Sequence, residues 1–127
     1  MADGVYSMFG DYAPMEELQN LGKRYPQLHL YFDDVHGMSW IGKNGTGYVL
    51  DSLQELNENT ILVGTLSKTF GASGATLFCK DEKLRNKIKT FGGPLTFSAQ
   101  LEPASVAAAI ASADIHLSPE IIIRQQE

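Results

Sequence analysis

The sequence predicts an α/β fold of three layers, αβα, in which helices cover a mostly parallel sheet. Predicted strands alternate with predicted helices along the chain. The strands are also apolar throughout instead of alternating between apolar and polar residues, which is typical of strands covered on both faces. The length of 127 residues is that of one domain, large enough to bury a single core.

The first half of the chain contains two predicted strands and two predicted helices. A β-favouring run predicts a short strand over 5–8, and a loop then leads to a helix over 15–25. Apolar residues recur at helical spacing in this helix, and its acids precede its bases, as the helix dipole favours. The next elements are an apolar strand, a glycine-rich loop and a short helix, over 28–32, 37–47 and 49–56.

The second half repeats the alternation of strands and helices. Apolar runs predict strands over 60–66 and 74–79, and helical patterns follow over 83–90 and 103–113. The tail over 115–127 stays unassigned, because its apolar isoleucines follow Pro119 and suggest an interrupted helix.

Composition excludes several classes of protein. Ten Lys+Arg against fifteen Asp+Glu give a net charge of −5, which argues against nucleic acid as a partner. The sequence has no apolar run long enough to span a membrane, so we expect a cytoplasmic protein without a membrane partner. The single cysteine, Cys79, lies in an apolar strand and is expected to be a buried small hydrophobe. No Cys/His cluster has metal-binding spacing, so no metal site is expected.

Polar residues follow three of the predicted strands at the points where the strands end. These groups are Ser7, the segment 33–36 and the segment 65–68. Ligands of open α/β sheets bind outside the carboxyl ends of the strands. The sequence therefore predicts a ligand site at this edge of the sheet.

Lys68 directly follows an apolar strand and is surrounded by small residues. A lysine at a ligand edge can be partly desolvated, which makes its amine nucleophilic and able to form a Schiff base with a carbonyl. A solvated surface lysine is the alternative, since most lysines are exposed.

Asp33 and Asp34 are adjacent in an extended segment, so their side chains point to opposite faces and only one of them can face a ligand. The pair could also serve in a turn with capping roles. The hydroxyls of Thr65 and Ser67 could hold a phosphate, although the sequence contains no Walker A loop.

Taken together, these segments resemble the pyridoxal-phosphate enzymes of fold type I, in the aminotransferase class I/II superfamily, and within them the α-oxoamine synthase family. The matching segments are 3–14, 33–37, 64–71 and, less closely, 97–103. The resemblance implies that residues 1–127 are the central part of the large cofactor-binding domain. It places an N-terminal part and a C-terminal small domain outside this sequence.

The resemblance also implies roles for five residues. Lys68 is similar to the lysine that binds pyridoxal 5'-phosphate covalently and moves protons at the substrate Cα. Asp33 resembles the carboxylate that pairs with the pyridinium nitrogen, and His36 resembles the residue at the phenolic oxygen, making Lys68, His36 and Asp33 the catalytic residues. Ser7 corresponds to a second group at that oxygen and Thr65 to a phosphate ligand, whereas Asp34 is expected to be structural.

The reaction implied by the resemblance is condensation of an amino acid with an acyl-CoA to give an α-amino ketone, in a homodimer. A transaminating enzyme of the same superfamily and a non-catalytic truncated domain remain open as alternatives. The segments 98–99 and 100–103 depart from the family's usual pattern, which leaves the substrate open. Trp40 is expected to be a packing residue, and Arg24, Arg85 and Arg124 to be surface charges.

Overall fold

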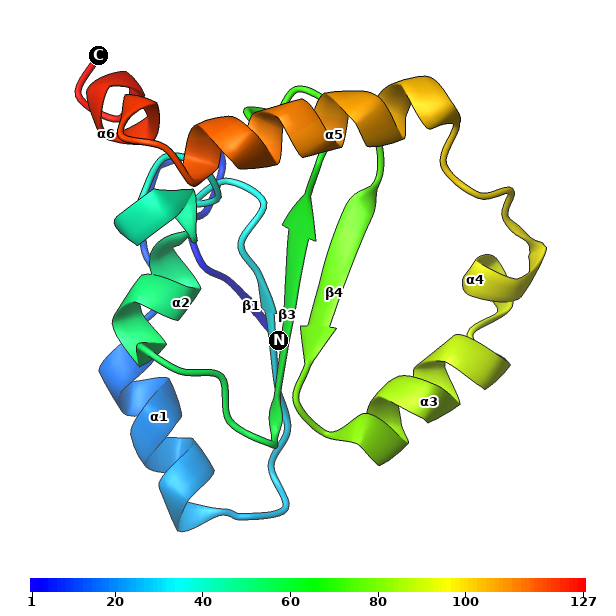
Figure 1. Ribbon diagram of the computed structural model, residues 1–127. Helices are drawn as coiled ribbons and strands as arrows, with labels where there is room; N and C mark the ends of the chain where they lie inside the picture. Colours follow the sequence, from blue (N-terminus) through cyan, green and yellow to red (C-terminus); the bar gives the residue numbers. More distant parts are fainter.

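Four strands form a single sheet in the computed structural model, which describes all residues from 1 to 127 (Figure 1). They are β1 (Ala2–Asp3), β2 (Leu30–Asp33), β3 (Thr60–Thr65) and β4 (Ala75–Cys79), and they lie in this order across the sheet. β1, β2 and β3 are parallel, while β4 pairs antiparallel with β3. The connection over 66–74 is too short for a crossover, and an antiparallel hairpin results. The predicted α/β fold with a mostly parallel sheet is confirmed, with one antiparallel edge strand.

Helices α1 (Met15–Arg24) and α2 (Tyr48–Leu53) pack on one face of this sheet. Buried and half-buried residues alternate along β2 and β3, because successive side chains of a strand point to opposite faces. Apolar side chains from both layers form the core under these helices, namely Ala13, Met15, Leu30, Phe32, Val49 and Leu62. The face that carries Asp33 and Val63 is only half-buried.

The remaining helices lie beyond β4 and across the top of the sheet. They are α3 (Glu82–Phe91), α4 (Gly93–Phe97), α5 (Pro103–His116) and α6 (Glu120–Arg124). In Figure 1, α3 and α4 stand on the opposite side of the strands from α1 and α2, and α5 crosses the end where β3 finishes. None of these helices combines the length and the apolar character that crossing a bilayer requires.

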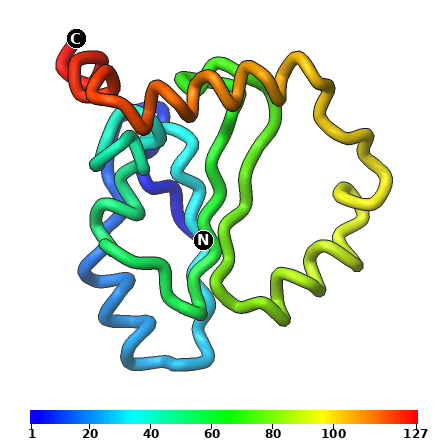
Figure 2. Tube along the Cα trace, in the orientation of Figure 1, coloured from blue at the N-terminus to red at the C-terminus, as the bar shows by residue number.

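Most of the C-terminal tail, which the sequence left unassigned, is helical. α5 continues to His116, and α6 begins after Pro119. Figure 2 shows this end of the chain returning to the loop over 37–47, which contains the short 3₁₀ helix η1 (Lys43–Gly45). Gln125 Nε2 donates to the carbonyl oxygens of Gly42 at 3.0 Å and Ser39 at 3.3 Å, so α6 is fastened to that loop.

Two predictions are corrected by the structure. The strand expected over 5–8 is absent, because β1 ends at Asp3 and Val5 makes only an isolated bridge to Tyr12. The chain turns back here through hydrogen bonds from Tyr6 N to Asp11 O and from Gly10 N to Tyr6 O. Trp40 is 52% exposed and is therefore not a core packing residue, whereas Cys79 is buried as expected.

Candidate functional site

The polar segments gather at the carboxyl edge of the three parallel strands. In the sheet register Asp3 lies beside Asp33, and Asp33 lies beside Val63. Gly4 N donates to Asp33 O at 2.7 Å, which extends the pairing of the first two strands by one residue. The segments that follow the three strands therefore leave the sheet at the same edge.

His36 and Lys68 lie in direct contact although they are 32 positions apart in the sequence. Lys68 Nζ donates to His36 Nε2 at 2.8 Å, and both side chains are exposed. Because an ammonium group can only donate, Nε2 is the acceptor and the proton of a neutral imidazole lies on Nδ1. The structure thus brings together two of the five predicted site residues, and their contact favours the Nδ1–H tautomer of His36.

Asp33 is the last residue of β2, so its side chain points to the half-buried face at the start of the turn. Its Oδ1 accepts a hydrogen bond from Val35 N at 3.0 Å. This bond is an Asx turn, which redirects the chain from the strand into the turn that carries His36. Asp33 therefore lies on the same connection as His36, three residues before it.

Thr65 ends β3 and organises the loop over 66–74 that carries Lys68. Its Oγ1 accepts a hydrogen bond from Ser67 N at 3.0 Å and donates to Gly74 O at 3.4 Å. Ser67 Oγ donates to the same carbonyl at 3.1 Å and accepts from Gly74 N at 3.2 Å. These bonds close the base of the loop and project Lys68 from it.

Ser7 is exposed in the turn between β1 and α1. It makes no hydrogen bond to Asp33, His36, Thr65 or Lys68. The structure therefore places Ser7 after the first parallel strand but does not join it to the other predicted site residues.

Asp34 is buried on the opposite face from Asp33. Its Oδ2 accepts from Val49 N at 2.8 Å, at the beginning of α2, while Oδ1 has no partner. Loss of solvent raises the pKa of this carboxyl to about 6. The hydrogen bond from Val49 N acts in the opposite direction and lowers this pKa, but its effect is smaller. Added Cβ atoms on Gly4, Gly37 and Gly47 would come within 2.2–2.3 Å of its oxygens, so three glycines make room for the carboxyl.

His116 is a site-adjacent residue that the sequence did not reveal. Its Nδ1 lies 2.7 Å from Ser112 O and its Nε2 lies 2.8 Å from Ser39 Oγ, in the turn that follows His36. Its ring also packs on Phe70, with centroids 4.7 Å apart. A lone histidine at the end of an alanine-rich helix gives no pattern from which these contacts could be predicted.

An apolar cavity of roughly 590 Å³ lies on the Asp34 side of the sheet. Leu62, Phe70, Phe78 and Leu117 are among its lining residues, and Asp34 and His116 also reach it. Asp33, His36 and Lys68 do not line it. The candidate chemistry is therefore at the strand ends and not in this cavity. No group of three or more His, Cys, Asp or Glu is arranged to hold a metal ion.

Comparison with known proteins shows the family of the chain. The family model for aminotransferases of class I and II matches residues 1–126. The chain therefore belongs to the aminotransferase class I and II family, and its relatives and structural neighbours place it among the α-oxoamine synthases.

Among its curated relatives are two enzymes named 8-amino-7-oxononanoate synthase. The one from Petrotoga mobilis is 36% identical over 125 residues, covering 98% of this chain and 31% of the relative. The one from Hydrogenovibrio crunogenus is 38% identical over 109 residues, covering 86% of this chain and 27% of the relative. The chain thus spans less than a third of the length of these relatives.

Solved structures give the same assignment of fold. Serine palmitoyltransferase from S. paucimobilis, with a bound pyridoxal phosphate–myriocin aldimine, has a TM-score of 0.78 at 31% identity, over 92% of this chain and 30% of that chain. The 8-amino-7-oxononanoate synthase of Francisella tularensis has a TM-score of 0.74 at 28% identity, over 93% of this chain and 34% of that chain.

Proposed function

We propose that residues 1–127 are the cofactor-binding core, within the large domain, of a pyridoxal-phosphate-dependent acyltransferase. The reaction is condensation of an amino acid with an acyl-CoA to give an α-amino ketone. The observation that carries the proposal is the 2.8 Å hydrogen bond from Lys68 Nζ to His36 Nε2, at the sheet edge where Asp33 ends β2. The names of the relatives, 8-amino-7-oxononanoate synthase and serine palmitoyltransferase, support the synthase reaction.

The donor set at this edge fits pyridoxal phosphate. A primary amine, Lys68 Nζ, suits an aldehyde carbon, and a carboxylate, Asp33, suits a protonated ring nitrogen. The hydroxyl of Thr65, which donates to Gly74 O at only 3.4 Å, would suit a phosphate oxygen. When bound, pyridoxal phosphate supplies an electron-accepting ring that stabilises negative charge at the substrate Cα.

Lys68 and His36 would act as a pair. Lys68 Nζ would hold the cofactor at its aldehyde carbon, and the free amine would hold or move the proton at the substrate Cα. His36, held in its Nδ1–H tautomer by Lys68, orients the amine before binding. Both side chains are exposed at the strand ends, where a ligand can reach them.

Asp33, Thr65 and Ser7 would bind and orient the cofactor. The Asp33 carboxylate would hold a proton on the ring nitrogen, which would keep the ring a strong electron acceptor. Thr65 Oγ1 would hold a phosphate oxygen in place of Gly74 O, and Ser7 Oγ and His36 would hold the phenolic oxygen. We place this reaction in the cytoplasm.

The first experiment is to add pyridoxal phosphate to the purified protein, reduce with borohydride and map the modified lysine by mass spectrometry. We expect modification of Lys68 in the unaltered protein and in Lys43→Ala, and its loss in Lys68→Ala. Lys43 is a suitable control because it is also an exposed lysine in a glycine-rich loop. A folded protein that is not modified at Lys68 would remove the cofactor assignment.

A second experiment separates the alternatives. Amino acid and acyl-CoA are added together, and release of free CoA is followed. CoA release supports the synthase, whereas transfer of the amino group to a 2-oxo acid without CoA release identifies a transaminating enzyme. A protein that is modified at Lys68 but does neither is a non-catalytic cofactor-binding domain.

A further inference from the structure

We propose that His116 is a positioning residue, whose imidazole holds the loop of Lys68 and the turn of His36 in their relative positions. The proposal rests on the proposed function, because that function gives the contact between Lys68 and His36 its purpose. The evidence is the set of contacts that His116 makes at the end of α5. The proposed reaction assigns no role to this part of the chain.

The two nitrogens of His116 have different partners. Nδ1 lies 2.7 Å from Ser112 O, and since a carbonyl oxygen only accepts, Nδ1 carries the proton. Nε2 then accepts from the hydroxyl of Ser39 at 2.8 Å. Ser39 is only 5% exposed and has φ of 71°, a conformation that a residue with a side chain rarely adopts without support. The His116 bond supplies part of that support.

His116 also contacts the loop that carries Lys68. The ring of His116 packs on Phe70, with centroids 4.7 Å apart and planes inclined by 32°. Phe70 follows Lys68 by two residues, and Ser39 follows His36 by three. One imidazole therefore contacts both of the segments whose relative position sets the distance between Lys68 Nζ and His36 Nε2.

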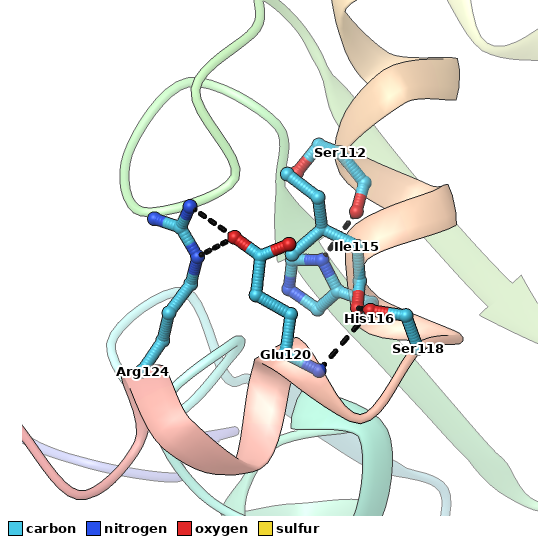
Figure 3. A network of polar contacts seen from close by, with 6 residues as sticks. All are labelled: Ser112, Ile115, His116, Ser118, Glu120 and Arg124. Atoms are coloured by element: carbon cyan, nitrogen blue, oxygen red, sulfur yellow. Dashed lines mark hydrogen bonds and ion pairs between the residues drawn. The ribbon is translucent and has the colours of Figure 1, made fainter.

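The residues that pack around the His116 ring leave little space next to it. A Cβ on Gly45, which has φ of +67°, would come 2.9 Å from His116 Cδ2 and 2.8 Å from Ser39 Cα. The end of α5 is itself fixed, as Figure 3 shows: Ser118 Oγ donates to Ile115 O at 2.8 Å and accepts from Glu120 N at 3.2 Å. Glu120 in turn pairs with Arg124 (Figure 3). The ring is thus held by an ordered helix end and contacts buried Ser39 in one loop and half-buried Phe70 in the other.

The experiment follows the ring nitrogens of His36 by long-range ¹H–¹⁵N spectra, which require no cofactor. In the unaltered protein we expect the single Nδ1–H tautomer that the Lys68 contact imposes. His116→Phe keeps a ring against Phe70 but removes both hydrogen bonds, and we expect His36 to lose the fixed tautomer. His116→Gln, whose amide reaches toward Ser39, restores part of the signal. His29→Phe is the control, since His29 is exposed and makes one local bond.

Ser39→Ala provides a second test if His116→Phe does not fold, because it removes the hydroxyl partner and leaves α5 intact. In a folded His116→Phe or Ser39→Ala protein, an unchanged His36 signal would overturn the proposal. The rate of borohydride-trapped modification of Lys68 is measured on the same variants, with an expected fall of about tenfold or more. If Lys68 of the unaltered protein is not modified, the proposed function fails, while the His36 spectra still decide the role of His116.

Discussion

Adjacent residues at the end of β2 have opposite environments. Asp33 lies on the half-buried face and closes an Asx turn, whereas Asp34 is buried beneath α2. The division follows from the alternation of side chains along an extended chain, which is why the sequence could separate a ligand-facing acid from a structural one. The sequence could not show that Asp34 accepts a bond from the start of a helix 15 positions away.

The buried carboxyl of Asp34 predicts a pH-dependent stability. Burial raises the pKa of Asp34 to about 6 in the folded protein. Between about pH 4 and pH 6 the folded state holds a proton that the unfolded chain releases, so stability falls as the pH rises through this window. Asp34→Asn stays neutral and can still accept from Val49 N. We expect it to abolish this pH-dependent loss of stability, which is on the order of 3 kcal/mol.

Urea unfolding at several pH values measures this effect. The free energy of unfolding of the unaltered protein should fall relative to Asp34→Asn between about pH 4 and pH 6 and stay constant above that range. Asp51→Asn, an exposed acid in α2, is the control and should follow the unaltered protein. Parallel curves for all three proteins would show that Asp34 does not titrate in this range.

The glycines around Asp34 give a second prediction at the residue scale. Gly47 has φ of +96°, and a Cβ there would lie 2.3 Å from Asp34 Oδ2. Gly47→Ala should therefore lower the free energy of unfolding by about 2–4 kcal/mol, through backbone strain and overpacking. Gly10→Ala separates the two causes, because Gly10 has φ of +71° but open space around it. Equal losses in thermal or urea unfolding would mean that the close approach to Asp34 contributes nothing.

At the scale of elements, β2, β3, β4 and the long helices followed from sequence patterns. The predicted helix over 15–25 and strand over 60–66 match α1 and β3 to within a residue at either end. The sequence patterns failed where the structure of a segment depends on whether another segment pairs with it. The run over 5–8 has β propensity but no partner strand, so its residues form a turn. α4 was not predicted, since five residues contain too little periodicity.

The ends of the helices differ in a way that can be measured. Asp81 caps α3, and its Oδ1 accepts from Lys83 N at 2.8 Å and Leu84 N at 3.1 Å. Asp81→Ala should therefore lower the free energy of unfolding by about 1 kcal/mol, and Asp81→Asn by much less, because Asn retains the acceptor. Glu102 at the start of α5 makes no cap hydrogen bond, so Glu102→Ala should change stability little. A loss at Glu102 as large as that at Asp81 would contradict the assignment of the cap.

For the whole molecule, the exposed apolar surface predicts self-association. Large apolar side chains are open to solvent on α3 and α4, with Phe91 81% and Phe97 90% exposed. Most soluble proteins cover apolar surface where it forms a large patch. We expect sedimentation velocity to show association that increases with protein concentration, in line with the proposed homodimer.

Substitution on α3 and α4 tests where that association occurs. Phe91→Ser combined with Phe97→Ser should weaken it, and Met8→Ser, at an exposed residue in the turn after β1, should not. A monomer at every concentration, or equal weakening by Met8→Ser, would contradict an interface on α3 and α4.

The sequence by itself determined the fold class, the order of most elements and the residues at the strand ends. These properties depend on local patterns: apolar runs, helical spacing, and polar residues placed where a strand stops. The tertiary structure decided which of those residues meet. Lys68 reaches His36, and His116 reaches both of their loops, through contacts between segments 32 to 77 positions apart. No local pattern encodes such contacts, because they depend on sheet register and on where α5 crosses the sheet.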